Sequence, residues 1–253
     1  MRANRIKAMW REGRPVKAVW TISGDPLTTE ILGNAGFDAV VLDMQHGFAI
    51  GPERAGVFLH AISTTPAVPL VRVPWNDPVH VQYVLDAGAY GVIAPLVNTP
   101  EDAERAAGAC RYPPIGYRSA GPNRVSFYGG DDYLAHANDE VICLVMIEHI
   151  QAVERLDLIA RVPGIDGFFI GPGDLALSMG LDPGAASSDP SYVAAVTHVR
   201  DVAKEHGLVS GIPPADPVEA RRRFDEGFAF CPMGSDWGFL AEGAEAALRA
   251  FGK

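Results

Sequence analysis

The sequence predicts a single (β/α)8 barrel of 253 residues. Eight short runs of apolar and β-branched residues alternate along the whole chain with eight segments of helical pattern. Most of these runs are continuously apolar, as is typical of parallel strands that are covered on both faces. A barrel of this kind occupies about 250 residues as one domain. A doubly wound open sheet is the alternative, but the GxGxxG turn that typically follows its first strand is missing.

Turn and capping residues bound each predicted element. The predicted strands are Val16–Ser23, Asp38–Gln45, Val68–Val73, Gly91–Val97, Val141–Glu148, Gly167–Gly171, Leu208–Ile212 and Phe228–Gly234. The predicted helices are Leu27–Ala35, Glu53–Ser63, Val79–Ala89, Glu101–Arg111, Ala152–Arg161, Tyr192–His206, Val218–Glu226 and Phe239–Phe251. Asp-Pro pairs at 77–78, 189–190 and 216–217 each place a capping carboxylate before a proline of the first helical turn. Glycines at 36, 88, 207 and 227 mark helix ends, because glycine readily adopts the left-handed conformation found there.

The segment 112–138 interrupts this even alternation and is rich in Pro, Gly, Arg and Tyr. A loop of that length in a compact domain usually has a function. We interpret it as a rim or interface element with a short helix near Asp131–Ala137.

The composition describes an acidic globular protein, with 21 Lys and Arg against 31 Asp and Glu and a formal net charge of −10. This charge disfavours nucleic acid and anionic membranes as main partners. The longest apolar stretch, near Val141–Ile147, is far shorter than the ~20 residues that cross a bilayer, and the charged N-terminal residues lack the apolar core of a secretory signal. We therefore expect a soluble, cytoplasmic protein in which Cys110, Cys143 and Cys231 are buried free thiols.

Polar and aromatic side chains gather where the predicted strands end, which is where barrel enzymes carry their catalytic groups. Strands one, two, three, five and six contribute them, whereas the seventh and eighth strands end mostly in Gly, Pro and Ser. The residues concerned are Trp20, Asp43, His46, Arg72, Glu148 and Asp174.

Glu148 and Asp174 follow neighbouring strands and can therefore meet one divalent cation. Mg²⁺ and Mn²⁺ typically take one or two protein carboxylates and fill their other positions with water and substrate oxygens. The alternative is structural: Asp174 caps the helix after the sixth strand, and Glu148 pairs with Arg72 or Arg118.

Three further groups at this end have candidate roles in binding and proton transfer. Arg72 can neutralise a substrate carbonyl or carboxylate oxygen, or can form a salt bridge at the rim. His46 lies three residues after Asp43 and is a candidate general base, or a hydrogen-bonded loop histidine. Backbone N–H groups of the turn that contains Gly173 and Asp174 can hold a carboxylate or phosphate, although its glycines also suit a simple tight turn.

The chain has only four lysines, Lys7, Lys17, Lys204 and Lys253, and none ends a predicted strand. A Schiff-base aldolase of the barrel type needs a lysine there, so that mechanism is excluded. If the site activates a carbonyl compound, a metal ion must accept the developing negative charge.

Seven motifs occur in order along the chain: AGFD at 35–38, LDMQHG at 42–47, VRVPWNDP at 71–78, LDAGA at 85–89, RYPPIGYR at 111–118, IE at 147–148 and GFFIGPGDL at 167–175. Together they resemble the HpcH/HpaI family of class II, metal-dependent pyruvate aldolases. The resemblance extends over almost the whole chain. It implies a barrel that assembles into hexamers, with a C-terminal helix that can exchange between subunits.

The resemblance also implies roles for individual residues. Glu148 and Asp174 would bind Mg²⁺, Mn²⁺ or Co²⁺, which a 2-keto acid chelates through its carbonyl and one carboxylate oxygen. Backbone N–H groups of Gly173 and Asp174 would hold that carboxylate, and Arg72 would stabilise the enolate oxygen. His46 would act as the base.

Three other positions complete this implied site. Asp43 and Asp86 would orient His46, and Trp20 would line the pocket. The sequence departs from the family pattern at Gln45, where many relatives have Glu, and the loss of that charge alters the hydrogen bonding expected around His46. The preferred aldehyde and donor are therefore left open.

The leading functional hypothesis is an aldolase that reversibly cleaves a 4-hydroxy-2-keto acid into pyruvate or hydroxypyruvate and an aldehyde. The alternative is a lyase or thioesterase for CoA thioesters, of the citrate lyase β or malyl-CoA type. It would need a basic surface near the barrel mouth, for which Arg118 and Arg124 are the clustered candidates. A non-catalytic scaffold or binding protein is the third hypothesis, but it gives no reason for polar groups to gather at the strand ends.

Overall fold

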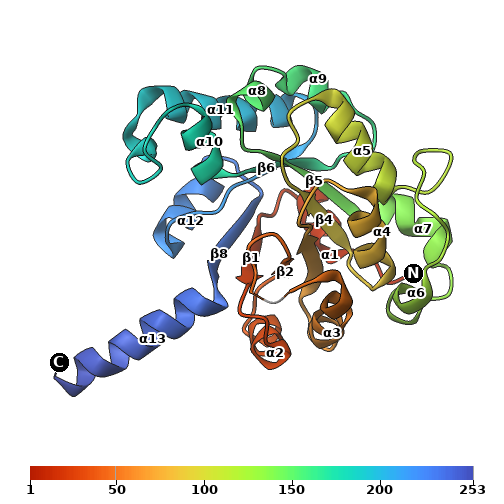
Figure 1. Ribbon diagram of the computed structural model, residues 1–253, viewed down its shortest axis with the longest axis horizontal. Coiled ribbons are helices and arrows are strands. Elements are labelled where there is room, and N and C mark those ends of the chain that lie inside the picture. The colour runs from red at the N-terminus through yellow and green to blue at the C-terminus, as the bar shows by residue number, and fades with distance from the viewer. Residues whose placement is uncertain (49, 253) are drawn as a thin grey trace.

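The computed structural model describes residues 1–48 and 50–252. Eight parallel strands close into a barrel in the order β1 to β8, with β8 paired to β1 (Figure 1). They are β1 (Val16–Thr21), β2 (Ala39–Asp43), β3 (Val68–Arg72), β4 (Gly91–Ala94), β5 (Ile142–Ile147), β6 (Gly167–Ile170), β7 (Val209–Gly211) and β8 (Phe230–Ser235). The predicted (β/α)8 barrel is confirmed, and every predicted strand overlaps an observed one.

Helices follow the strands, and most of them cover the outside of the barrel. They are α1 (Arg5–Arg11), α2 (Pro26–Asn34), α3 (Pro52–Ser63), α4 (Pro78–Asp86), α5 (Pro100–Cys110), α6 (Asn123–Gly129), α7 (Tyr133–Glu140), α8 (Ile150–Val153), α9 (Leu156–Ala160), α10 (Pro172–Ser178), α11 (Pro190–Glu205), α12 (Pro217–Asp225) and α13 (Asp236–Phe251), with a 3-10 turn at Ala186–Ser188. The helix predicted at 152–161 is divided into α8 and α9. Helices α1 and α6 were not predicted, and the helix expected after the sixth strand, α10, was given no bounds, because seven residues hold too few turns for a helical pattern to be recognised.

The predicted helix signals are confirmed in the structure. Asp77, Asp189 and Asp216 each accept a backbone N–H of the helix that follows. These bonds satisfy donors that the first helical turn leaves without a partner. The four helix-ending glycines all have positive φ, as at Gly88 with φ 112°. Local sequence therefore determines where most helices begin and end.

The strands are buried on both faces, which explains why their apolar runs are continuous. All residues of β2, β4, β5 and β6 are buried. Aromatic rings fill the barrel between β1, β6 and β8, where Phe169 makes edge-to-face contacts with Trp20 and Phe230 at centroid distances of 5.9 Å. The three cysteines are free and buried, as predicted.

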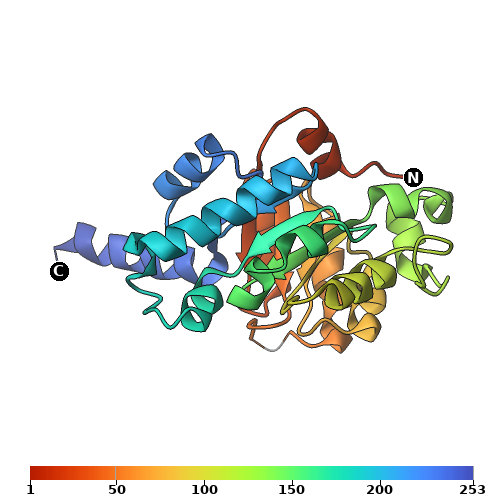
Figure 2. The ribbon, with the colours of Figure 1, turned by 90° about the horizontal axis from the view of Figure 1, so that it is seen from above.

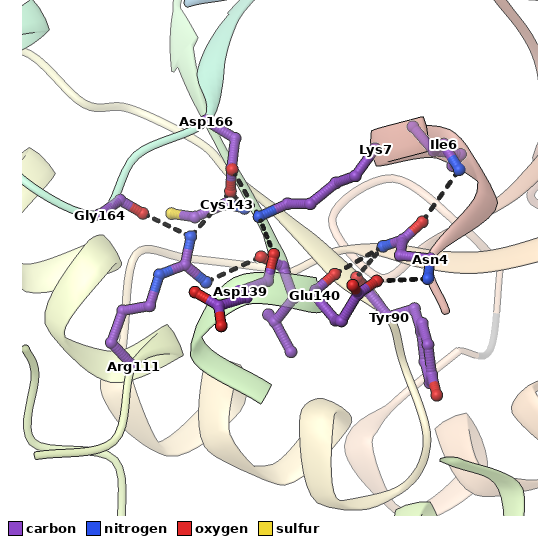
Figure 3. Close-up of polar contacts among 11 residues, drawn as sticks. Asn4, Ile6, Lys7, Tyr90, Arg111, Asp139, Glu140, Cys143, Gly164 and Asp166 are labelled. Atoms are coloured by element: carbon purple, nitrogen blue, oxygen red, sulfur yellow. Dashed lines mark hydrogen bonds and ion pairs between the residues drawn. The ribbon is translucent and has the colours of Figure 1, made fainter. Parts of the chain in front are cut away.

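A polar network closes the amino end of the barrel (Figure 3). Asp166, just before β6, forms ion pairs with Lys7 of α1 at 2.7 Å and with Arg111 at 2.8 Å. Asn4, which caps α1, donates to the carbonyl groups of Tyr90 and Glu140. The network ties the N-terminal segment to the starts of the strands, opposite the end where the candidate residues lie.

Helices α6 and α7 of the long segment 112–138 lie beside the N-terminus (Figures 1 and 2). Arg2 donates its backbone N–H to the carbonyl of Gly129, and Arg124 donates to the carbonyl of Ala87 at the end of α4. These helices thus lie at the amino end of the barrel. The short helix predicted near Asp131–Ala137 is confirmed as α7. The segment does not lie at the rim of the carboxyl end, because its arginines anchor it to the opposite end, and its interpretation as an interface element stays a prediction.

The last helix, α13, projects away from the barrel in both ribbon views (Figures 1 and 2). It leaves large apolar side chains in solvent, among them Leu240 at 73% and Phe251 at 86% exposure. Within residues 1–48 and 50–252, no helix combines the length and the apolar character needed to cross a membrane.

Candidate active site

The carboxyl ends of the strands surround a cavity of about 240 Å³. Five predicted site residues line it: Trp20 near the end of β1, Arg72 at the end of β3, His46 in the loop after β2, and Gly173 and Asp174 in the first turn of α10. Its other lining residues are Met146, Phe169, Ile170, Gly171, Pro172 and Pro213. The predicted clustering at the strand ends is therefore observed in three dimensions.

Glu148, directly after β5, is the buried acid of this site, with an exposure of 2%. Its Oε1 accepts the backbone N–H of Leu96 at 2.6 Å. A Cβ atom on Gly171 would lie 2.5 Å from Glu148 Oε2, so a larger residue at 171 would displace the carboxylate. The Gly-Pro-Gly turn after β6 thus makes room for the acid at the end of β5.

The carboxylates of Glu148 and Asp174 lie close enough to interact. Burial raises the pKa of Glu148 above its usual value, and the Leu96 hydrogen bond opposes that rise. The charge of Asp174 raises the same pKa further, and Arg72 lowers it. Two mutually repelling carboxylates at a partly dry site suit a hard divalent cation, which takes oxygen ligands.

The structural alternatives proposed for these acids are not observed. Helix α10 is capped at Gly171 without any side-chain bond, so Asp174 is not its cap. Arg118 forms its ion pair with Asp86 and Arg72 with Asp43, so neither arginine forms an ion pair with Glu148 within the described residues. In the part of the chain that the structure describes, no three His, Cys, Asp or Glu side chains converge on a common point. A cation held by these two carboxylates would therefore take its remaining ligands from water and substrate.

Arg72 is fixed between an acid and an aromatic ring. Its Nε and Nη2 donate to the two carboxylate oxygens of Asp43 at 3.0 and 2.5 Å. Its guanidinium lies over the Trp20 ring, 4.6 Å from the centroid. No hydrogen bond joins its Nη1 to another residue within 1–48 and 50–252, so a planar guanidinium held in this way can direct Nη1 at a ligand in the cavity.

Asp43 also organises the loop that carries His46. Its Oδ1 accepts the backbone N–H groups of Gln45 and His46 at 3.0 and 3.2 Å. No hydrogen bond joins the His46 imidazole to another residue of the described chain. Asp43 thus binds the backbone of His46. We predicted that Asp43 orients the imidazole ring, but the structure shows no direct hydrogen bond between the two side chains.

Asp86 lies away from this cavity within the chain. It is the last residue of α4, which runs from the carboxyl end of β3 back to the amino end of β4. There its Oδ1 accepts Arg118 Nη2 at 2.7 Å. The predicted pairing of Asp86 with His46 does not occur in this chain, because one helix length separates the two ends of the barrel.

Arg118 and Arg124, the candidates for a basic surface that binds CoA, do not lie near the barrel mouth. Arg118 is buried and bonded to Asp86 and Tyr133. Arg124 donates to the carbonyl of Ala87 and the hydroxyl of Ser63. Both arginines serve to attach the long segment 112–138, so the residues named for the CoA-thioester alternative do not border the barrel mouth.

One backbone feature of this site was not predicted. Leu96 lies just after β4 and has φ 55°. Among the non-glycine residues that the structure describes, it alone has a positive φ. That conformation costs a branched side chain about 1 kcal/mol or more, and such strain clusters at functional sites. It directs the Leu96 N–H at Glu148, and no local sequence signal reveals it.

The comparisons with known proteins agree with this geometry. A family model described as HpcH/HpaI aldolase/citrate lyase matches residues 17–242. The chain is 41% identical over 245 residues to a hydroxypyruvate/pyruvate aldolase from Rhizorhabdus wittichii, with 97% of each chain covered. It is 36% identical over 255 residues to a 5-keto-4-deoxy-D-glucarate aldolase from Escherichia coli, with 99% of this chain and 97% of the relative covered.

A solved structure gives the same result. An HpcH/HpaI aldolase/citrate lyase family protein from Burkholderia cenocepacia matches with a TM-score of 0.91 and 32% sequence identity, covering 99% of this chain and 100% of its own. The sequence match, the barrel and the acid pair after β5 and β6 all agree with the resemblance that the motifs indicated. The chain belongs to the HpcH/HpaI aldolase/citrate lyase family.

Proposed function

We propose that the protein is a divalent-metal-dependent aldolase that reversibly cleaves a 4-hydroxy-2-keto acid into a small 2-keto acid and an aldehyde. The observation that carries the proposal is the approach of the Glu148 and Asp174 carboxylates beside a cavity that also holds Arg72. The name of the Rhizorhabdus wittichii relative supports pyruvate or hydroxypyruvate as the 2-keto acid.

Glu148 and Asp174 would hold the cation, for which Mg²⁺, Mn²⁺ and Co²⁺ are the candidates. Its ligands would be carboxylate oxygens, which suit hard cations, together with oxygens of the keto acid. When bound, the cation supplies an electrophile that stabilises negative charge on the keto-acid oxygen.

The residues around the cation would bind the keto acid and hold it in one orientation. The backbone N–H groups of Gly173 and Asp174 would bind its carboxylate, and a Cβ atom on Gly173 would meet no other atom within 4 Å, so that face is open. Arg72 would donate to the enolate oxygen, where a preorganised donor stabilises charge as it develops. Trp20 would form one wall and keep Arg72 in place.

His46 would move the protons of the reaction. In the cleavage direction it would take the proton from the 4-hydroxyl group, so that the bond between C3 and C4 breaks. The aldehyde leaves, and the electron pair of that bond becomes the enolate of the 2-keto acid. Return of a proton to C3 then gives the free 2-keto acid, and the reverse sequence forms the bond.

We also propose a homo-oligomer, with a hexamer as the expected assembly, in which α13 is exchanged between subunits. The projection of α13 and its exposed apolar side chains support this arrangement, because such surfaces are usually covered by another chain (Figure 1). A cytoplasmic location is part of the proposal, since the three cysteines are free, as is usual in reducing compartments.

The test is release of pyruvate from a 4-hydroxy-2-keto acid before and after treatment with EDTA. We expect EDTA to abolish turnover, and added Mn²⁺ or Mg²⁺ to restore it. Full turnover in the presence of the chelator would overturn the mechanism. A panel of aldehydes offered with pyruvate and with hydroxypyruvate then defines the donor and acceptor.

A further inference from the structure

We propose that the first turn of α13, through Asp236 and Trp237, positions residues 44–48, the His46 loop. The inference rests on the proposed function for its kinetic part only. Asp236 and Trp237 are positioning residues, because neither lines the cavity around Arg72 and Asp174.

Asp236 is a buried carboxylate, 4% exposed, that binds the segment after β1. Its Oδ1 accepts the backbone N–H of Ile22 at 3.0 Å. Its Oδ2 accepts the backbone N–H of Ser23 at 3.0 Å and the Ser23 hydroxyl at 2.6 Å. The Thr21 hydroxyl also donates to Oδ2, at 3.3 Å. A buried acid with this many donors holds its partners firmly, since hydrogen bonds to a charged acceptor are the stronger kind.

The same segment then holds the His46 loop. The carbonyl of Ile22 accepts the backbone N–H of Phe48 at 2.7 Å. Ile22 therefore bridges the two sites, because its N–H is bound to Asp236 and its carbonyl to a residue two positions after His46.

A second contact joins the helix to the loop without passing through Ile22. The ring of Trp237 lies 6.4 Å from the ring of Phe48, tilted by 48°. Aromatic pairs at such distances attract each other beyond the effect of their buried area. The first turn of α13 thus contacts the His46 loop through two separate routes.

The His46 loop depends on such backbone anchors, because the imidazole has no hydrogen bond to another residue of the described chain. Asp43 holds the start of the loop through the N–H groups of Gln45 and His46. The turn at Gly47 is tight, since a Cβ there would lie 2.0 Å from the carbonyl oxygen of Asp43. The hydrogen bond from Phe48 to Ile22 holds the other end of the loop. Because Ile22 is itself bound to Asp236, Asp236 helps to position His46.

The test combines hydrogen exchange with kinetics on the full-length protein. The variants are Asp236→Asn, Trp237→Ala and the conservative Trp237→Phe. Asp189→Asn is the matched control, because Asp189 is likewise a carboxylate at the start of a helix, but among the described residues its side chain accepts hydrogen bonds from Ser191 and Tyr192 alone. We expect faster amide exchange in residues 44–48 for Asp236→Asn and Trp237→Ala, near wild-type exchange for Trp237→Phe, and no change for Asp189→Asn. Unchanged exchange in the first two variants would overturn the proposal, whatever reaction the protein catalyses.

The kinetic measurements test whether His46 is the group that Asp236 and Trp237 position. We expect Asp236→Asn and Trp237→Ala to lower kcat about tenfold or more, since small misplacements of a catalytic group are costly. Mn²⁺ affinity measured by calorimetry should stay at the wild-type value, because the acid pair follows β5 and β6. In a His46→Ala background the same substitutions should have no further effect on kcat. An equal loss in both backgrounds would overturn the positioning role, whereas absence of metal-dependent turnover in the wild type would count against the proposed function alone.

Discussion

Glu148 illustrates how a functional residue can oppose the stability of its own fold. Its carboxylate is buried and lies beside a second acid, and the Leu96 N–H and the Arg72 charge offset only part of that cost. The result is a raised pKa, which means that the ionised form is less favourable in the folded protein than in the unfolded chain. Stability is therefore lost as the pH rises from the usual glutamate value of 4.5 through the folded pKa.

We predict that Glu148→Gln stabilises the metal-free protein while it abolishes metal binding. Glutamine keeps the Oε1 acceptor for Leu96 and removes the buried charge. A gain of about 1 kcal/mol would raise Tm by about 2–4 °C for a chain of this size. Thermal unfolding at pH 7 in EDTA, with Mn²⁺ calorimetry beside it, checks both parts. A lower Tm for the variant in EDTA would contradict the prediction.

We predict that Arg72→Ala lowers kcat about 10²–10³-fold, the usual effect of removing a donor to a developing oxyanion. Arg72→Lys should recover little of this loss, because a point charge cannot replace the paired bonds to Asp43 and the contact with Trp20. Steady-state kinetics with saturating Mn²⁺ measures the effect. A near wild-type rate for either variant would refute the proposed role.

At the scale of elements, the two ends of the barrel have separate tasks. Helix α1 and the ends of α5 and α7 close the amino end through Asp166 and Asn4, whereas the loops at the carboxyl end carry the cavity (Figure 3). Buried charges at the closed end are paired and bonded to backbone carbonyls, as in the bonds from Arg111 to Val141 and Gly164. Because the two ends are separate, substitutions at the amino end can change the stability of the barrel without changing the residues of the cavity.

We predict that Arg111→Ala destabilises the fold by about 3–5 kcal/mol, as expected when one partner of a buried ion pair is removed. Arg249→Ala is the control, because its pair with Glu245 on α13 is exposed and should contribute less than about 1 kcal/mol. Urea unfolding of both variants compares the two losses. Similar free energies of unfolding for the two variants would contradict the prediction that the polar network at the amino end stabilises the barrel.

At the scale of the whole molecule, α13 is the element that the barrel leaves uncovered. Its apolar side chains include Leu240 and Leu248, both exposed in the single chain. Covering them requires another surface, and exchange between identical subunits offers one at low cost. The same helix begins at Asp236, so its first turn would connect assembly with the placement of the His46 loop.

We predict that the double variant Leu240→Asp, Leu248→Asp dissociates the assembly. Light scattering should give about 162 kDa for the wild type, six chains of 27.0 kDa each, and a smaller mass for the variant. Glu242→Gln on the same helix is the control and should keep the wild-type mass. A wild-type mass of one chain, or a variant of unchanged mass, would overturn the proposed exchange.

Most of the barrel could be predicted because its signals are local. Continuous apolar runs identify strands that are buried on both faces, and Asp-Pro pairs and glycines bound the helices. The short helices α1 and α6 were missed, and α10 was expected without bounds, because seven residues show too little periodicity. The sequence did not show at which end of the barrel the segment 112–138 lies, since the arginine contacts that fasten it to the amino end join residues distant in sequence.

The sequence by itself determined the barrel, the order of its strands and main helices, and the set of polar residues at the strand ends. Only the tertiary structure decided how these residues meet. It placed Glu148 beside Asp174 across Gly171, bonded Asp43 to Arg72, and carried Asp86 to the far end of α4. The physical reason is that strand and helix patterns reflect neighbours along the chain, whereas the site depends on the closure of the barrel and the direction in which each helix returns.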